Sequence, residues 1–251
     1  MLEMPPPIRL VPLTGLPEIE PGHDLAASLR EAAKTAGVAL AGNVVVVCQK
    51  VVSKAEGRLV ALADVEPRPE ARQIAAEHDR DPRQVELVLR ETRRIVRRGH
   101  GVLICETHHG FVCANAGVDL SNAPGVDIAV LLPLDPDASA RRLHEALSEP
   151  GAPTPVIVSD TFGRPWREGL VDVALGCAGL APIRDDRGSL DRAGRELVVT
   201  RPATADQLAA AAGLLMWKGA GVPAVVVEGF PFEGDGRLRE LLRDPSTDLF
   251  K

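Results

Sequence analysis

The feature that most constrains the fold is a set of short, uninterrupted runs of apolar residues rich in valine and isoleucine. Residues 44–47 read VVVV, residues 155–158 read PVIV and residues 222–227 read VPAVVV. A strand with one face in water alternates apolar and polar residues, whereas a continuous apolar run is typical of a strand buried on both faces. The sequence therefore predicts a sheet whose strands are covered on both sides.

Helical patterns lie between these runs. Asp24 and Gly37 predict the two ends of one helix, because aspartate caps helix N-termini and glycine adopts the left-handed conformation that ends a helix. Residues 68–98 carry apolar residues at helical spacing and predict one or two amphipathic helices. Residues 204–221 predict a further helix with Thr204 as its N-cap.

The loose alternation of strands and helices predicts an α+β (mixed α/β) fold. Residues 180–197 contain small residues and two charged turns, so we expect an irregular arm there, and we expect this arm to form part of a subunit interface. No hinge-like linker divides the chain. Residues 1–251 are therefore predicted to form a single unit.

Composition excludes several classes of protein. The net charge is -6 and aromatic residues make up only 3% of the chain, which argues against general binding to nucleic acid or to an anionic membrane surface. No apolar run approaches the roughly 20 residues that span a bilayer, and we see no secretion signal. The four cysteines form no CxxC pair and are predicted to be buried thiols in a reducing compartment. We therefore expect a cytoplasmic protein.

Two segments place a carboxylate and a hydroxyl directly after an apolar run. Asp119 is followed by Ser121 and Asn122, and Asp160 is followed by Thr161. Carboxylate, hydroxyl and amide oxygens are ligands for a hard divalent cation such as Mg²⁺, which also bridges to substrate phosphates. Each aspartate could instead cap a turn or a helix, and the residues alone leave both readings open.

A third segment could bind an anion. Gln49, Lys50, Ser53 and Lys54 follow the buried run at residues 44–47. Lysine ammonium groups can neutralise phosphate, although the glycine-rich GxxxxGK[ST] loop is absent. The alternative is a pair of solvated lysines.

Two further places carry positive charge beside glycine or tryptophan. Lys218 and Gly219 offer an ammonium group and a backbone that a ligand could approach closely, or a simple helix end. Arg164 and Arg167 could clamp a carboxylate or phosphate, or pair with Glu168 at the surface.

Four blocks together resemble a known family. They are TGLPEIEPGHDL (14–25), KVVSKAEGR (50–58), CANAGVDLSN (113–122) and VSDTFGRPWREGLVDVALGCAGL (158–180). In this order they resemble the γ-glutamyl ligases that act on precursors of coenzyme F420, a deazaflavin hydride carrier. The resemblance extends over nearly the whole chain.

The resemblance implies a function and an assembly. Such enzymes use GTP as co-substrate with Mg²⁺ or Mn²⁺, and the resemblance allows for a monovalent cation such as K⁺. They join L-glutamate to the lactyl carboxylate of the precursor through an acyl phosphate, and some extend a γ-linked polyglutamate tail. The resemblance also implies an unusual ligase fold and an intertwined homodimer. Some bacterial relatives carry a C-terminal flavin-reductase-like domain; none is expected within this chain, which is either a stand-alone ligase or a truncated one.

The resemblance also assigns residues. Asp119, Asp160 and Thr161 match metal ligands, and the two aspartates are the expected catalytic residues. Lys218 falls where some relatives carry an acidic residue near a second metal ion, and Gln49 falls where relatives can have a serine. The positions expected at the nucleotide are Leu16, Pro17, Glu18, Ile19, Gln49, Lys54, Asn122, Lys218 and Gly219.

Two other functions stay open at this point. A metal-dependent phosphatase can also use an aspartate that follows a strand, but the Asp-x-Asp-x-Thr pattern is missing here because the sequence reads Ser159-Asp160-Thr161-Phe162. A non-catalytic protein that binds a nucleotide or a deazaflavin would need neither metal nor turnover.

Overall fold

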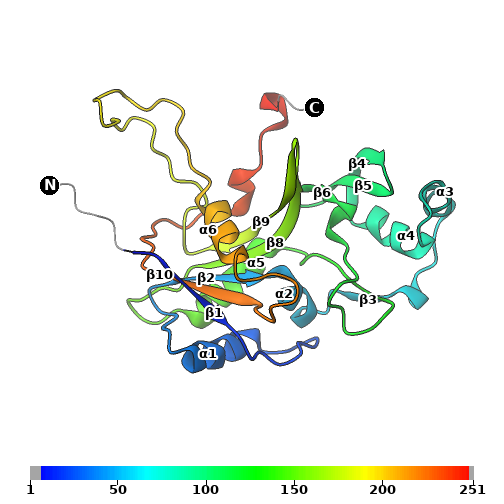
Figure 1. Ribbon diagram of the computed structural model, residues 1–251, viewed down its shortest axis with the longest axis horizontal. Helices are drawn as coiled ribbons and strands as arrows, with labels where there is room; N and C mark the ends of the chain where they lie inside the picture. Colours follow the sequence, from blue (N-terminus) through cyan, green and yellow to red (C-terminus); the bar gives the residue numbers. More distant parts are fainter. Residues whose placement is uncertain (1–6, 249–251) are drawn as a thin grey trace.

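The computed structural model describes residues 7–248, and a five-stranded sheet lies at its centre (Figure 1). The strand order is β1-β10-β2-β8-β9. Strands β2 and β8 run parallel, whereas the other neighbouring pairs are antiparallel. The strands are β1 (Arg9–Leu13), β10 (Ala224–Glu228), β2 (Val44–Cys48), β8 (Val156–Arg164) and β9 (Arg167–Ala178).

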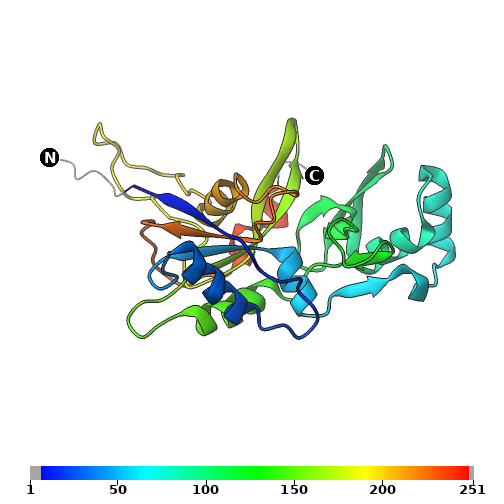
Figure 2. The same cartoon turned by 60° about the horizontal axis from the view of Figure 1, so that its bottom comes forward.

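Helices cover both faces of this sheet (Figure 2). Helices α1 (Leu25–Ala36) and α5 (Pro136–Leu147) lie on one face, and α6 (Thr204–Gly213) lies on the other. Val45 packs in the first layer and Val44 in the second, because successive side chains of a strand point to opposite faces. The prediction that the continuous apolar runs are strands buried on both sides is confirmed.

The predicted helix ends are right for α1 and wrong for α6. Asp24 caps α1 by accepting a hydrogen bond from the Ala27 N–H at 2.9 Å, and Gly37 ends it in the left-handed conformation with φ of 67°. Helix α6 begins at Thr204, with Ala203 as its N-cap, and it ends at Gly213 rather than near residue 221. The following residues bond to carbonyls three positions back, so the helix tightens and stops.

Residues 59–130 form a smaller lobe beside the central sheet (Figures 1 and 2). Its two small sheets have the strand orders β3-β7 and β4-β5-β6, and α3 and α4 pack against the second of them. The elements are β3 (Leu59–Ala61), α3 (Pro69–His78), α4 (Pro82–Arg90), β4 (Thr92–Gly99), β5 (Val102–Thr107), β6 (Val112–Ala114) and β7 (Ile128–Val130).

The prediction of helices over residues 68–98 holds only as far as Arg90. The remainder is strand β4, which pairs with β5 and contains two irregularities in its register. Ile95 packs against the core of the small lobe, while Arg94 on β4 pairs with Glu106 on β5 at 2.7 Å. These cross-strand contacts come from a later segment, so they override the local helical pattern.

The sequence predicted a strand that ends at Asp160-Thr161, but strand β8 continues to Arg164. Strands β8 and β9 form a long hairpin that stands out from the sheet (Figure 1). A register shift beside Ser159 marks a bulge at the base of this hairpin, and bulges bend and twist a strand locally. Asp160 therefore lies in the wall of the hairpin and not in a loop.

An irregular arm leaves the sheet after β9, as predicted, and projects away from the body of the molecule (Figure 1). Its exposed apolar side chains include Leu190, Val198 and Val199. The intertwined homodimer stays a prediction. Among the residues described, no helix has both the length and the apolar character needed to cross a membrane, and the four cysteines are free thiols.

Candidate active site

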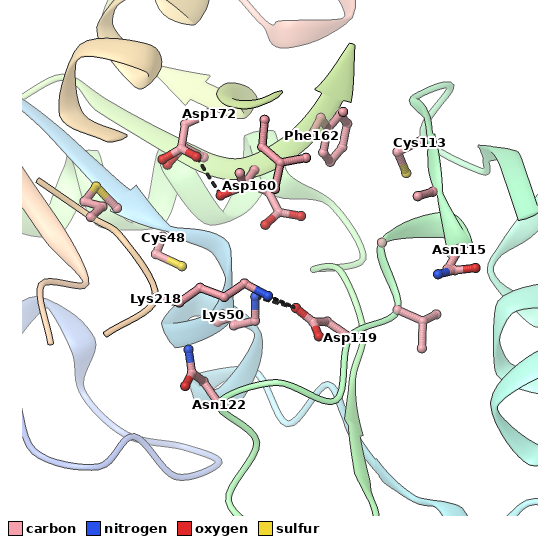
Figure 3. A pocket seen from close by; sticks show the side chains of 18 residues that line it. Cys48, Lys50, Cys113, Asn115, Asp119, Asn122, Asp160, Phe162, Asp172 and Lys218 are labelled. Atoms are coloured by element: carbon pink, nitrogen blue, oxygen red, sulfur yellow. Dashed lines mark hydrogen bonds and ion pairs between the residues drawn. The ribbon is translucent and has the colours of Figure 1, made fainter. Parts of the chain in front are cut away.

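A cavity of about 280 Å³ lies where the small lobe meets the base of the β8–β9 hairpin (Figure 3). Four segments line it: the start of helix α2 (Gln49–Ala55), residues 113–122, the hairpin, and the loop after α6. The polar and thiol side chains around it are Cys48, Lys50, Cys113, Asn115, Asp119, Asn122, Ser159, Asp160, Thr161, Asp172 and Lys218. Asp119 and Asp160, distant in the sequence, thus line one cavity.

Backbone contacts hold Asp119 in place. Its N–H donates to the Val130 carbonyl at 3.1 Å, and its own carbonyl accepts from the Val130 N–H at 2.8 Å. Just before it, Gly117 has a φ of 73°, and a Cβ there would lie 2.7 Å from Leu132. Only glycine fits this approach, so the segment reaches the cavity wall along a defined path. The Asp119 carboxylate then accepts the N–H and the hydroxyl of Ser121, both at 2.8 Å.

Two lysines neutralise the Asp119 carboxylate. Lys50 Nζ lies 2.9 Å from Asp119 Oδ2, and Lys218 Nζ lies 3.8 Å from the same oxygen and 3.1 Å from Ser121 Oγ. Burial opposes the ionisation of Asp119, but the hydrogen bonds from Lys50 and Ser121 outweigh it and lower the pKa of Asp119 to about 2. Burial lowers the pKa of Lys50, but the hydrogen bond to Asp119 and the nearby Asp160 outweigh this effect and raise it.

Asp160 has the opposite electrostatic character. Burial raises its pKa to about 6, and the negative charges of Asp119 and Asp172 add to the effect, while Lys50 opposes it. The Lys50 ammonium is hydrogen-bonded to Asp119, so it neutralises Asp160 only from a distance. A carboxylate with a raised pKa in a cavity is a mark of a functional site.

Thr161 and Asp172 face each other across the hairpin. They are partners in the β8–β9 register, and the Thr161 hydroxyl donates to Asp172 Oδ1 at 2.6 Å. No role for Asp172 was predicted from the sequence. Its only signal is a charged residue inside the apolar pattern LVDVALG. Lys50 was noted as a candidate anion ligand, and the structure places it at the centre of the site.

Some predicted nucleotide positions lie outside the cavity. Asn122 and Lys218 line it, whereas the other positions do not. Lys54 lies one helical turn after Lys50 on α2 and pairs with Glu18 at 2.5 Å. The loop that carries Glu18 therefore borders α2. Outside the cavity lie Leu16, Pro17, Glu18, Ile19, Gln49, Lys54 and Gly219.

Gln49 and Gly219 differ in their surroundings. Gln49 is fully buried, its Oε1 accepts from Ser53 Oγ at 2.8 Å, and its Nε2 has no hydrogen-bond partner among the described residues. Gly219 is exposed in the loop beyond α6 and is not the cap of that helix. Arg164 and Arg167 pair at the tip of the hairpin and do not themselves line the cavity, although the neighbouring Gly163 does.

The donor chemistry around the cavity suits a hard divalent cation. Asp119, Asp160 and Asp172 offer carboxylate oxygens and Thr161 a hydroxyl oxygen, which are the ligand types that Mg²⁺ and Mn²⁺ favour. The mutual repulsion of the carboxylates, which contributes to the raised pKa of Asp160, would be relieved by a cation. Within residues 7–248, however, no three His, Cys, Asp or Glu side chains are already grouped closely enough to hold one.

Carboxylate oxygens and lysine ammonium groups around one cavity are typical of enzymes that handle phosphates together with a divalent cation. The chain belongs to a specific family of ligases, because residues 15–229 match the family model described as F420-0:Gamma-glutamyl ligase. The resemblance noted in the sequence is thereby confirmed.

Individual relatives agree along almost their full length. The chain is 45% identical over 250 residues to the coenzyme F420:L-glutamate ligase of Methanothermobacter thermautotrophicus, covering 97% of this chain and 99% of the relative. The protein of the same name from Methanopyrus kandleri is 44% identical over 253 residues, with 98% of each chain covered. That of Haloarcula marismortui is 41% identical over 245 residues, covering 94% of this chain and 93% of the relative.

Proposed function

We propose that this protein is a GTP- and metal-dependent ligase that adds L-glutamate to the lactyl carboxylate of the deazaflavin precursor of coenzyme F420, working as a homodimer. Membership of the ligase family supports the reaction. The observation that carries the proposal is the meeting of Asp119, Asp160 and Thr161 with Lys50, Lys218 and Asn122 around one cavity.

Helix α2 and the loop beside it are proposed to hold the nucleotide. Lys50 and Lys54 lie one turn apart on α2, and Lys218 faces the same carboxylate as Lys50. Lysine ammonium groups offset the charge of phosphate oxygens. A triphosphate could therefore extend from the cavity along α2 toward residues 16–19.

Asp119, Asp160 and Thr161 are proposed to hold the divalent cation, Mg²⁺ or Mn²⁺. When bound, such an ion neutralises charge on the phosphate oxygens during transfer. The residues of the protein fix the positions of the proposed ligands. Hydrogen bonds from Ser121 and the backbone pair of Asp119 with Val130 fix the Asp119 carboxylate. The ladder of β8 and β9 does the same for Asp160.

The proposed chemistry activates a carboxylate. The γ-phosphoryl group of GTP passes to the precursor carboxylate, which yields an acyl phosphate and GDP. The glutamate amine, having lost a proton, attacks the carbonyl carbon and displaces phosphate, so an amide bond forms. Repetition on the new terminal glutamate would extend a γ-linked tail.

The alternatives are less well supported. A phosphatase of the Asp-x-Asp-x-Thr type would need a second aspartate at residue 162, where this chain has phenylalanine. A non-catalytic binding protein would need no clustering of carboxylates with raised and lowered pKa values beside two lysines. The names of the relatives also favour a ligase.

The direct test is product analysis. Incubation of the purified protein with GTP, Mg²⁺ or Mn²⁺, L-glutamate and the deazaflavin precursor is expected to give a product heavier by one or more glutamyl groups in mass spectrometry, with GDP released in step. GTP hydrolysis that proceeds without glutamate and precursor would instead support the phosphatase, and metal-independent binding without turnover would support the binding protein.

A further inference from the structure

Asp172 lines the cavity, and it is the one aspartate there to which no role was assigned from the sequence. It lies in the middle of β9, directly opposite Thr161 on β8, and its Oδ1 accepts the Thr161 hydroxyl at 2.6 Å. Aspartate is disfavoured in strands, and a single cross-strand pair contributes little to stability. The pair is therefore a poor way to stabilise a hairpin, and its place in the cavity wall suggests another use.

A glycine at the end of α6 leaves space for the Asp172 carboxylate. Gly213, the last residue of α6, packs against it, and a Cβ at residue 213 would lie 2.6 Å from Asp172 Oδ2 and 2.8 Å from Cγ. Any other residue at 213 would push the carboxylate aside. Asp172 is thus held from one side by Thr161 and from the other by the end of α6.

The hydrogen bond determines what Thr161 offers to the cavity. A hydroxyl has one proton and two lone pairs. Because the proton points to Asp172, the oxygen is left with only lone pairs for any further partner. A proton turned toward the cavity would instead repel a cation.

We propose that Asp172 is a positioning residue that keeps the Thr161 hydroxyl oriented as an acceptor for the divalent cation and adds a negative charge beside it. This rests on the proposed function, in which Thr161 is a metal ligand. Outer partners that orient a metal ligand typically change metal affinity by 10–100-fold when removed. The proposal therefore predicts a loss of metal affinity that depends on Thr161.

The test is a double-mutant cycle read out as Mn²⁺ affinity by electron paramagnetic resonance, in the presence of GDP, on the full chain. Asp172→Ala and Thr161→Val are each expected to weaken Mn²⁺ binding about tenfold. The double variant should lose clearly less than the product of the two single losses, because only the charge of Asp172 acts independently of Thr161. Asp172→Asn, which keeps an acceptor oxygen but no charge, should lie between wild type and Asp172→Ala. Asp64→Asn on the exposed surface of the small lobe is the matched control and should bind as wild type does.

Three outcomes would overturn the proposal: wild-type affinity in Asp172→Ala, losses that simply add in the double variant, or no Mn²⁺ binding by the wild-type protein. Melting temperatures measured alongside separate a folding defect from a binding defect, and rescue by Asp172→Asn is not expected of a folding defect. Failure of the proposed ligase function would give a different result. The wild-type protein would then form no glutamylated product, although the Mn²⁺ affinities of the four proteins would still follow the predicted double-mutant cycle.

Discussion

Lys50 and Asp119 form a 2.9 Å ion pair inside the cavity, and Lys218 approaches the same carboxylate oxygen at 3.8 Å. A cation that binds Asp119 must therefore compete with two ammonium groups for its carboxylate. An anion that binds those ammonium groups would in turn release the carboxylate. The proposed nucleotide and the proposed metal should consequently bind more tightly together than apart.

Replacing Lys218 should uncouple the two ligands. Lys218→Met removes one competing charge, so Mn²⁺ alone should bind several-fold more tightly, and the gain in Mn²⁺ affinity on adding GDP should shrink from the 5–150-fold that is typical of coupled sites. Mn²⁺ titrations with and without GDP measure both quantities. Lys34→Met, whose lysine is 80% exposed on α1, is the control. Unchanged coupling in Lys218→Met would show that this lysine does not compete with the metal.

Asp160 should be indispensable for catalysis. Asp160→Ala and Asp160→Asn are expected to abolish glutamate ligation while the far-ultraviolet circular dichroism stays that of the wild type, because the side chain lies in the cavity wall and the β8–β9 ladder does not depend on it. Product mass spectrometry checks the activity. Turnover near the wild-type rate in either variant would remove Asp160 from the mechanism.

The same residue should reduce stability at neutral pH. The pKa of Asp160 is raised from its ordinary value of 3.8 to about 6, so the native state binds this proton more tightly than the unfolded chain does. Its contribution to stability is fully present below about pH 4 and is lost as the pH rises to about 6. The loss corresponds to about 3 kcal/mol.

Urea unfolding in the presence of a chelator, compared between wild type and Asp160→Asn, isolates this effect. The variant should gain in relative stability as the pH rises from 4 to 7, since its amide does not ionise. A difference in unfolding free energy between the two proteins that is the same at pH 4 and pH 7 would mean that the carboxyl titrates normally.

Gly213 offers a test of packing around Asp172. An alanine in a helix is ordinarily more stable than a glycine by about 1 kcal/mol, but here the added Cβ would meet Asp172 Oδ2 at 2.6 Å. Gly213→Ala should therefore destabilise the wild-type protein. The same substitution should be much less destabilising in an Asp172→Ala background, because the contacts with Asp172 Oδ2 and Cγ are then absent. Thermal unfolding of the four proteins measures the difference. Equal effects in both backgrounds would argue that the carboxylate moves aside freely.

The sequence by itself determined the local features whose causes lie within a few residues. The valine runs predict strands covered on both sides because their continuity leaves no face for water. Asp24 and Gly37 mark the ends of α1 because capping is a local hydrogen-bond and backbone effect. The four sequence blocks were enough to indicate the ligase family. They contain all three aspartates that line the cavity, of which Asp119 and Asp160 were predicted as site residues.

Tertiary structure alone decided the features that depend on distant partners. Residues 92–99 form a strand because they pair with β5 through backbone hydrogen bonds and because Glu106 on β5 forms an ion pair with Arg94. Strand β8 ran on past Asp160 because β9 continued the ladder to Arg164. Lys50 and Asp172 joined the site through contacts with Asp119 and Thr161. The local sequence pattern does not predict such pairings, because the energy that stabilises them arises only when segments distant in the sequence come into contact.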